Sequence, residues 1–121
     1  MARVLVVEDD QDARLLISAC LRRAGHTVLT AESGYQALSL VFEEGLPEAA
    51  VLDLHMPGMD GFDVLTALQA TGLAGANTVV LTAVQGSSAR AAVTARGAHY
   101  LAKPFYPSEL TAAVEECTSA A

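Results

Sequence analysis

The chain has 121 residues, a length that predicts a single domain, residues 1–121, with a core buried between layers of helices. It carries seven Lys and Arg residues against fourteen Asp and Glu residues, a formal net charge of -7. Nucleic acid binding needs clustered cations that contact phosphates, so this charge argues against nucleic acid as a direct partner. No apolar run has the length of a membrane span or of a secretory signal, and we expect a cytoplasmic protein without a membrane partner.

The first half of the chain alternates between strand and helix patterns. Residues 4–7 are apolar at consecutive positions, which favours a strand buried on both faces, and residues 27–31 form a second predicted strand. Between these runs, apolar residues recur at helical spacing and stop before a glycine suited to end a helix; they are Ala13, Leu16, Ile17, Cys20, Leu21 and Ala24, with Gly25 after them. A second helical pattern consists of Ala37, Leu38, Val41 and Phe42 and ends at Gly45.

The second half continues this alternation. Residues 49–52, 79–81 and 100–102 are predicted strands. Three more helices are predicted, which begin near Asp60, at Ser87 (over 87–96) and at Pro107. Their inward-facing residues are expected to be Phe62, Leu65 and Leu68 in the first and Leu110, Ala113, Val114 and Cys117 in the last.

Strand and helix therefore alternate five times, a pattern that specifies an α/β domain with a doubly wound, five-stranded parallel sheet. Right-handed crossovers place helices on both faces only if the strand order reverses, and for five strands the common order is 2-1-3-4-5. The reversal then lies between the first and third strands. Ligands bind outside the carboxyl ends of the strands at such a point. The predicted site is therefore at the ends of residues 4–7 and 49–52.

Polar residues stand at the carboxyl ends of four of the predicted strands. Glu8 and Asp9 follow the first strand, Asp53 the third, Thr82 the fourth and Lys103 the fifth. Carboxylates crowded at one edge repel each other unless a cation is present, and oxygen ligands of this kind suit Mg²⁺. Asp53 is then a candidate nucleophile that accepts a phosphoryl group as an acyl phosphate. Lys103 and Thr82 are residue types that neutralise and hydrogen-bond phosphoryl oxygens.

Four motifs carry a resemblance to a known family. They are Val6-Val7-Glu8-Asp9-Asp10, Asp53-Leu54-His55-Met56-Pro57-Gly58-Met59-Asp60-Gly61, Leu81-Thr82-Ala83 and Lys103-Pro104-Phe105. Their order and spacing resemble those of the receiver domains of bacterial response regulators, the CheY-like family of two-component signalling. The resemblance extends from the first predicted strand to the last helix. Each motif alone is weakly specific, but the four in this order are highly specific.

The resemblance implies a flavodoxin-like (βα)₅ fold and a metal-dependent phosphoacceptor. Asp53 would accept the phosphoryl group. Asp9, Asp53 and the backbone carbonyl of His55 would bind Mg²⁺, with Mn²⁺ as an alternative, and Glu8 would contribute directly or through water. The domain would catalyse only its own phosphorylation and dephosphorylation and would otherwise not be an enzyme.

The resemblance also implies a switch. Thr82 and Lys103 would contact the phosphoryl group, and the peptide before Pro104 would be cis. Thr82 and Tyr100 would move together between the inactive and the active state. The simpler interpretation, which stays open, is that Thr82 is only a β-branched strand residue and Tyr100 only a packed ring.

Several partners are implied in the same way. A sensor histidine kinase or a phosphotransfer protein would donate the phosphoryl group from a phosphohistidine. An output partner would dock on the face formed by helix 87–96, strand 100–102 and the last helix, and a phosphorylation-dependent homodimer would use that face too. Because nothing follows Ala121, we expect the output to come from a partner chain or a further domain.

Other functions remain as alternatives. The chain could be a phosphoryl sink or relay cut from a hybrid kinase or a larger regulator. A phosphatase of the haloacid-dehalogenase type would need a second aspartate where His55 stands. A flavodoxin would need a glycine- and hydroxyl-rich phosphate loop where Glu8 and Asp9 stand. A receiver that is not phosphorylated usually lacks one of the acidic or lysine positions, and all of them are present here.

Two other sets of residues have structural interpretations. Asp10 and Asp12 are expected to cap free amides at the start of the first helix. Cys20 and Cys117 fit buried helix faces, and we expect both to be reduced thiols.

Overall fold

The computed structural model describes residues 2–83 and 87–118, and its elements alternate as the sequence predicts. In chain order they are β1 (Arg3–Val7), α1 (Gln11–Arg23), β2 (Thr27–Ala31), α2 (Gly34–Glu44), β3 (Ala49–Asp53), α3 (Gly61–Thr71), the 3₁₀ helix η1 (Gly75–Asn77), β4 (Thr78–Thr82), α4 (Ser87–Ala95), β5 (His99–Ala102) and α5 (Pro107–Thr118). The sequence pattern did not predict η1, because three residues are too few to show a hydrophobic period. None of the helices in the described ranges is long and apolar enough to cross a membrane.

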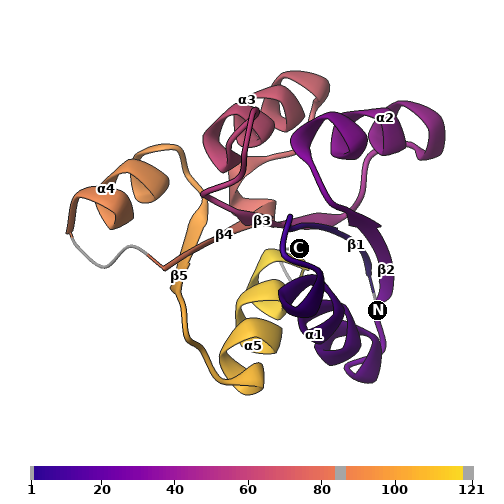
Figure 1. Cartoon of the computed structure of the whole chain (residues 1–121), viewed down its shortest axis with the longest axis vertical. Coiled ribbons are helices and arrows are strands. Elements are labelled where there is room, and N and C mark those ends of the chain that lie inside the picture. The colour runs from indigo at the N-terminus through magenta and orange to yellow at the C-terminus, as the bar shows by residue number, and fades with distance from the viewer. Residues whose placement is uncertain (1, 84–86, 119–121) are drawn as a thin grey trace.

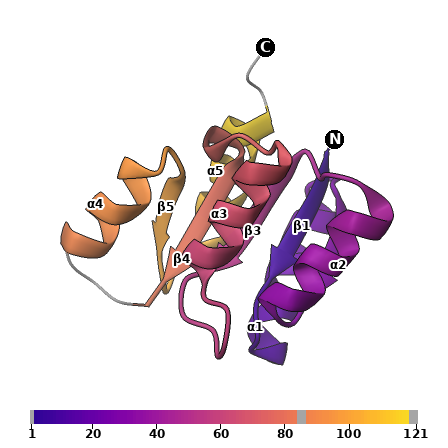
Figure 2. The same cartoon turned by 90° about the horizontal axis from the view of Figure 1, so that it is seen from above.

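The strands form one parallel sheet in the order β2-β1-β3-β4-β5, which confirms the predicted α/β class and strand order. α1 and α5 cover one face of the sheet, and α2, α3 and α4 cover the other (Figure 1). The order reverses at β1, which lies between β2 and β3. The carboxyl ends of the strands therefore share one edge, where the loop between β3 and α3 projects (Figure 2).

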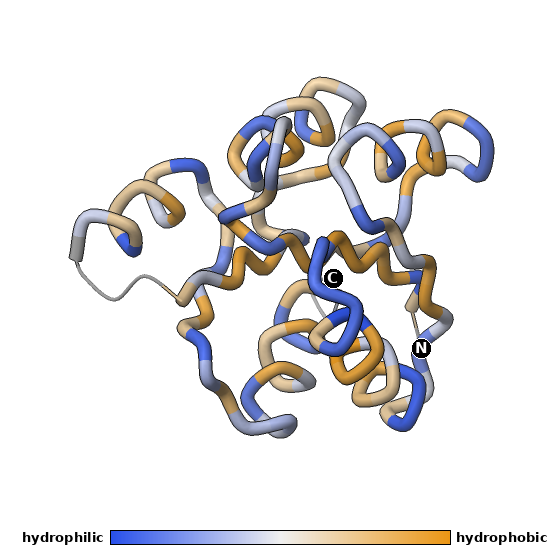
Figure 3. The backbone as a smooth tube through the Cα atoms, in the orientation of Figure 1, coloured by the Kyte–Doolittle hydropathy of each residue, from blue (hydrophilic) through white to orange (hydrophobic). Residues whose placement is uncertain are grey.

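Each face of the sheet has its own hydrophobic core. Leu5 and Val7 contribute to the core beneath α2, α3 and α4. Val4 and Val6 contribute to the core beneath α1 and α5. Since neighbouring residues of a strand point to opposite faces, a strand covered on both sides is apolar at every position. The central strands are accordingly hydrophobic along their length, whereas the helices contain both hydrophobic and hydrophilic residues (Figure 3).

Aspartate side chains fix where two of the helices begin. Asp10 accepts a hydrogen bond from the backbone N–H of Ala13 at 2.8 Å, and Asp12 lies in the first turn of α1. Asp60 accepts from the N–H of Asp63, whose carboxylate accepts from the N–H of Asp60 in return, a capping box at the start of α3. The predicted role of Asp10 as a helix cap is confirmed.

Two large apolar side chains of the predicted helix faces are exposed to solvent, and so is the small Ala24 at the end of α1. Phe42 in α2 is 92% exposed, and Leu16 in α1 is 59% exposed. The periodic pattern included both because each lies within four residues of a buried neighbour. The arc of α2 that contacts the core is narrower and contains Ala37 and Val41. The burial that the pattern implied for Phe42 and Leu16 is therefore wrong.

The two cysteines are both free, as expected. Cys20 is half-buried on α1, and Cys117 is buried on α5. Burial, followed by the negative charge of Glu116, raises the pKa of Cys117 to about 11. A thiol with so high a pKa is a packing residue rather than a nucleophile at neutral pH.

Candidate functional site

Three carboxylates meet at the carboxyl edge of the sheet. Glu8 and Asp9 directly follow β1, and Asp53 is the last residue of the neighbouring strand β3. One carboxylate oxygen of each residue lies within 4.8 Å of those of the other two. Glu8 is 1% exposed and Asp53 is 6% exposed, whereas Asp9 is open to solvent. The strand order thus brings together the acidic residues that the sequence placed where the strand order reverses.

Lys103 joins the two buried carboxylates. Its Nζ donates to Glu8 Oε1 at 2.8 Å and to Asp53 Oδ1 at 3.2 Å. The side chain reaches these groups from the end of β5, past the end of β4. The backbone N–H of Lys103 donates to the carbonyl of Thr82, and the peptide between Lys103 and Pro104 is cis, which confirms that prediction.

Burial and crowding change the proton affinities of these groups. Burial, and then the neighbouring Asp53 carboxyl, raises the pKa of Glu8 from 4.5 to about 7, although Lys103 acts in the opposite direction. Burial alone would lower the pKa of Lys103, but the hydrogen bond to Glu8 and the charge of Asp53 outweigh it and raise that pKa. Lys103 therefore remains cationic. Because two carboxylates share this one cation, the buried part of the cluster has an excess of negative charge.

One fully buried oxygen of the cluster makes no hydrogen bond within the described part of the chain. Glu8 Oε2 is buried and has no partner there. Burying such an atom without a partner costs free energy, which a cation with oxygen ligands would offset. Three carboxylates in this arrangement are hard oxygen donors of the kind that Mg²⁺ prefers. His55 lies two residues after Asp53, in the loop before α3, with an exposed side chain.

Thr82 and Tyr100 lie on the same face of the sheet. Thr82 ends β4, is fully buried and pairs in register with Ala102, while Tyr100 pairs with Val80. Residues two apart in a strand share a face, and Val80 and Tyr100 contact the core beneath α2, α3 and α4. The guanidinium of Arg90 on α4 lies over the Tyr100 ring, 5.7 Å from its centroid. Both predicted switch residues therefore face the α4 side.

Arg14 is a residue of this region that the sequence pattern did not indicate. Its guanidinium donates to the backbone carbonyl of Glu8 at 2.8 Å and lies 3.9 Å from the Glu32 carboxylate. It thereby ties the turn that carries Glu8 and Asp9 to α1. No motif distinguishes Arg14 from an ordinary surface arginine, so spacing alone could not have identified it.

Gly61 sets the distance between the start of α3 and the end of β3. A Cβ atom at this position would lie 2.5 Å from the carbonyl oxygen of Asp53 and 2.8 Å from the Cα of Leu54. The backbones approach so closely that a larger residue would displace the strand end. Gly61 therefore helps to hold Asp53 at the edge.

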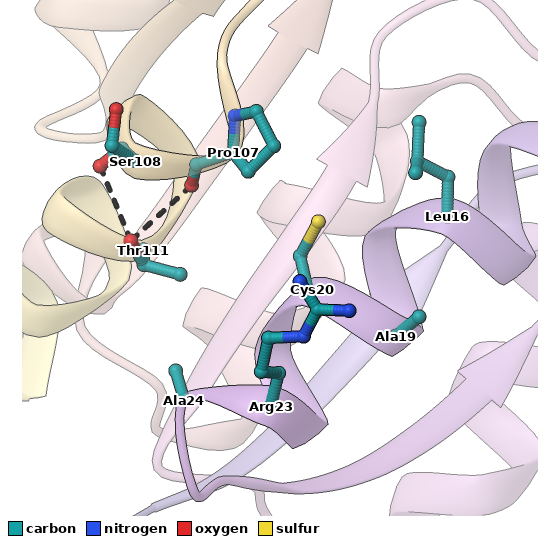
Figure 4. A pocket seen from close by; sticks show the side chains of 8 residues that line it. All are labelled: Leu16, Ala19, Cys20, Arg23, Ala24, Pro107, Ser108 and Thr111. Atoms are coloured by element: carbon teal, nitrogen blue, oxygen red, sulfur yellow. Dashed lines mark hydrogen bonds between the residues drawn. The ribbon is translucent and has the colours of Figure 1, made fainter.

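Two surface grooves among the described residues border α1, on the side of the sheet that α1 and α5 cover. The first, about 380 Å³, lies between these helices and contains no residue of the carboxylate cluster (Figure 4). It is lined by Leu16, Ala19, Cys20, Arg23, Ala24, Pro107, Ser108 and Thr111. The second, about 360 Å³ and mostly apolar, borders the site because Lys103, Pro104 and Phe105 form one of its walls. The three carboxylates therefore lie at the edge of the sheet, next to an apolar groove rather than inside one.

The family model of the response regulator receiver domain matches residues 4–115 of the sequence. The chain belongs to this family. Among receiver domains of known structure, the chemotaxis protein CheY4 of Vibrio cholerae is 29% identical, with a TM-score of 0.86 over 97% of this chain and 98% of that one. The receiver domain of the Francisella response regulator 1452 is 26% identical, with a TM-score of 0.87 over 98% of both chains. The receiver fold expected from the four motifs is confirmed.

Two curated relatives of this receiver domain are much longer proteins. The transcriptional regulatory protein PrrA of Mycobacterium tuberculosis is 43% identical over 117 residues, which are 93% of this chain and 48% of PrrA. The sensory/regulatory protein RpfC of Xanthomonas campestris pv. campestris is 38% identical over 112 residues, which are 89% of this chain and 15% of RpfC. The chain thus spans less than half the length of either relative.

Proposed function

We propose that this receiver domain, residues 1–121, is a phosphorylation-activated switch of a two-component system in the cytoplasm. A sensor histidine kinase or a phosphotransfer protein donates the phosphoryl group to Asp53 with the help of Mg²⁺. The contact of Lys103 Nζ with both Glu8 and Asp53, at 2.8 and 3.2 Å, carries this proposal. This contact holds an ammonium group next to the Asp53 carboxylate at the sheet edge, and phosphoryl transfer depends mainly on such positioning and charge.

Asp53 acts as the nucleophile in this account. One of its carboxylate oxygens forms a bond to phosphorus while the bond from phosphorus to the donor's imidazole nitrogen breaks, and the donor histidine takes up a proton as it leaves. Lys103 already donates a hydrogen bond to Asp53, so its ammonium group is close enough to follow the transferred oxygens. The apolar groove beside Lys103 gives a protein donor a surface to contact.

The donor set fits a divalent cation. Asp9, Asp53 and the backbone carbonyl of His55 would hold Mg²⁺, or Mn²⁺, and Glu8 would contact it directly or through water. Glu8 Oε2, which is buried and has no hydrogen-bond partner within residues 2–83 and 87–118, supports this assignment. When bound, the cation neutralises charge on the phosphoryl oxygens.

Thr82 and Tyr100 would transmit the change. A phosphoryl group adds about -1.5 to -2 of charge and strong acceptor oxygens, which would draw the Thr82 hydroxyl toward Asp53. Tyr100, on the same face, would turn into the vacated space and reshape the surface of α4, β5 and α5. An output partner or a second copy of the chain would dock there. A differential interaction of a few kcal/mol is enough to shift such a two-state population.

A phosphoryl sink or relay is the second candidate. The similarity to the sensory/regulatory protein RpfC favours it, because a receiver embedded in a long sensory protein could pass the group on rather than change shape. A phosphatase of the haloacid-dehalogenase type is less favoured, since His55 occupies the position of its second aspartate.

The phosphoacceptor is tested by intact-mass spectrometry after incubation with acetyl phosphate. We expect one added phosphoryl group, dependent on Mg²⁺ and labile to base. Asp53→Asn should abolish it. Asp60→Asn is the matched control, because Asn also caps a helix and Asp60 lies outside the carboxylate cluster. Modification of Asp53→Asn at the wild-type rate would contradict the assignment.

Hydrogen exchange with and without beryllofluoride, a phosphoryl mimic, distinguishes a switch from a sink. A switch should change protection most in residues 83–96, of which 84–86 lie outside the described residues, and around Tyr100. Thr82→Ala should uncouple that change from binding of the mimic. Changes confined to the loops that carry Asp9 and Asp53 would instead indicate a sink or relay.

A further inference from the structure

Positive charge is distributed unevenly along this chain. The Lys and Arg residues are Arg3, Arg14, Arg22, Arg23, Arg90, Arg96 and Lys103, so residues 24–89 contain none of them. The same stretch contains half of the Asp and Glu residues, namely Glu32, Glu43, Glu44, Glu48, Asp53, Asp60 and Asp63. It includes α2 and α3, which lie side by side on one face of the sheet (Figure 1, Figure 2). These two helices therefore contribute carboxylates and apolar groups to the surface, and no cation.

α2 exposes an apolar seam on this surface. Tyr35 is 65% exposed and Phe42 is 92% exposed, and Leu38 lies between them, half-buried. Their spacing of three and then four residues is that of one face of a coiled coil, and it places the three side chains along one line of the helix. A single exposed apolar residue is ordinary. A row of three with two aromatic rings is typical of a helix face that a partner helix covers.

The seam begins next to α3 and the loop that follows β3. A Cβ atom on Gly34, the first residue of α2, would lie 2.8 Å from both Met59 Sδ and Val64 Cγ2, so the two helices approach closely at their start. A Cβ on Gly58 would lie 3.6 Å from the Tyr35 ring. These contacts fix the start of the seam against the rest of the fold. A partner would therefore meet a positioned surface, which lowers the entropy cost of binding.

Carboxylates flank the other end of the seam. Glu43 and Glu44 occupy the last turn of α2, where the helix dipole disfavours negative charge. The guanidinium of Arg3 lies near this end, but it donates to the backbone carbonyls of Glu44, Gly45 and Leu46. Among the residues that the structure describes, neither carboxylate forms an ion pair. Their placement does not stabilise the helix, and both remain available to a cation from outside.

We propose that the outer face of α2, formed by Tyr35, Leu38 and Phe42 with Glu43 and Glu44 at its end, binds a cationic amphipathic helix of a partner protein. Apolar side chains of that helix would cover the two rings, and its Lys or Arg residues would pair with the two carboxylates. A helix fits better than an extended peptide because it presents side chains with the same three-and-four period. A second copy of this acidic face would be repelled, whereas a basic helix is attracted.

This surface goes beyond the proposed phosphorylation, because none of its residues belongs to the carboxylate cluster. The test therefore uses the unphosphorylated chain. The probe is a synthetic fluorescent peptide with Leu at the a and d positions of three heptads and Lys on the flanking positions. Fluorescence anisotropy measures its affinity. A scrambled peptide of the same composition, without an apolar face, and a peptide with Glu in place of Lys serve as comparisons.

We expect the amphipathic cationic peptide to bind and both comparison peptides to bind much more weakly. Phe42→Ser should weaken binding about tenfold or more, as expected for an aromatic side chain that a partner buries. Glu43→Gln combined with Glu44→Gln should weaken binding and reduce its dependence on salt. Leu15→Ser is the matched control, because Leu15 is a similarly exposed apolar residue on α1, 58% exposed. It should leave the affinity unchanged.

Three results would overturn the proposal. The first is equal affinity of wild type and Phe42→Ser, with circular dichroism showing both folded. The second is equal binding of the Glu peptide, which would remove the role of charge. The third is sedimentation showing that the chain dimerises through Phe42 while the cationic peptide does not bind, since a second copy would then cover the seam. Asp53→Asn should bind the cationic peptide as wild type does, because Asp53 is not part of the α2 face. If the peptide does not bind, the proposal for the α2 face fails and the phosphorylation proposal is unaffected.

Discussion

Val7 and Glu8 are neighbours at the end of β1, and both are almost fully buried, at 0% and 1% exposure. The same contrast occurs in β3, where buried Leu52 precedes buried Asp53. Burying the apolar side chains removes hydrocarbon from water and stabilises the fold. Burying the carboxylates costs free energy unless they are paired. The comparison indicates that the sheet interior holds the domain together, whereas the carboxyl edge lowers its stability by crowding carboxylates, as expected of the site that we propose there.

The largest expected effect is on the interior side of this comparison. Leu52→Ala should lower the free energy of unfolding by about 2–5 kcal/mol, because Leu52 is fully buried and its truncation leaves a cavity. Urea denaturation followed by circular dichroism measures the change. Leu16→Ala, at an exposed apolar position, should change the free energy by less than about 0.5 kcal/mol. Equal losses at both positions would break the comparison.

Removing the ammonium group of Lys103 from the edge should have the next largest effect. Lys103→Met leaves Glu8 and Asp53 without their shared donor and should lower the free energy of unfolding by about 1–3 kcal/mol at pH 8 without metal. The loss should be smaller at pH 6, where Glu8 is mostly protonated because its pKa is about 7. Arg22→Met, at an exposed position, is the control. A loss that is the same at both pH values would show that charge crowding is not its cause.

The raised pKa of Glu8 predicts how stability depends on pH. Between pH 4.5, its ordinary pKa, and about 7, the folded protein binds more protons at Glu8 than the unfolded chain does. Stability contributed by protonated Glu8 is therefore lost as pH rises through this window, by at most about 1.4 kcal/mol per pH unit. Glu8→Gln should remove this dependence. Denaturation of wild type and variant from pH 4 to 8, with chelator, gives the difference directly, and parallel curves would contradict the account.

Much of this edge could be predicted from the sequence, because strand order alone decides which chain segments end together. The apolar runs before Glu8, Asp53 and Lys103 were sufficient to predict that these residues meet. The different exposure of Glu8 and Asp9 could not be predicted, since it depends on how the turn after β1 packs against α1. The hydrogen bond from Arg14 that connects this turn to α1 could not be predicted for the same reason.

The helix faces were predicted less well than the strands. A helical period identifies a stripe of apolar residues, but the width of the arc that contacts the core depends on neighbouring elements. Phe42 lies outside that arc in α2, and Leu16 lies outside it in α1. The sequence shows that these residues are apolar, and only the packing of the helices shows that they remain exposed.

The most direct test of the carboxylate edge is the melting temperature of wild type, Asp53→Asn and Asp60→Asn with and without Mg²⁺. Without metal, Asp53→Asn should melt a few degrees higher than wild type, because it removes like-charge repulsion and leaves the packed volume filled. Added Mg²⁺ should raise the melting temperature of wild type and of Asp60→Asn by mass action, and that of Asp53→Asn much less. An equal rise in all three proteins would contradict the account, because the cation would then bind somewhere other than the cluster of Glu8, Asp9 and Asp53.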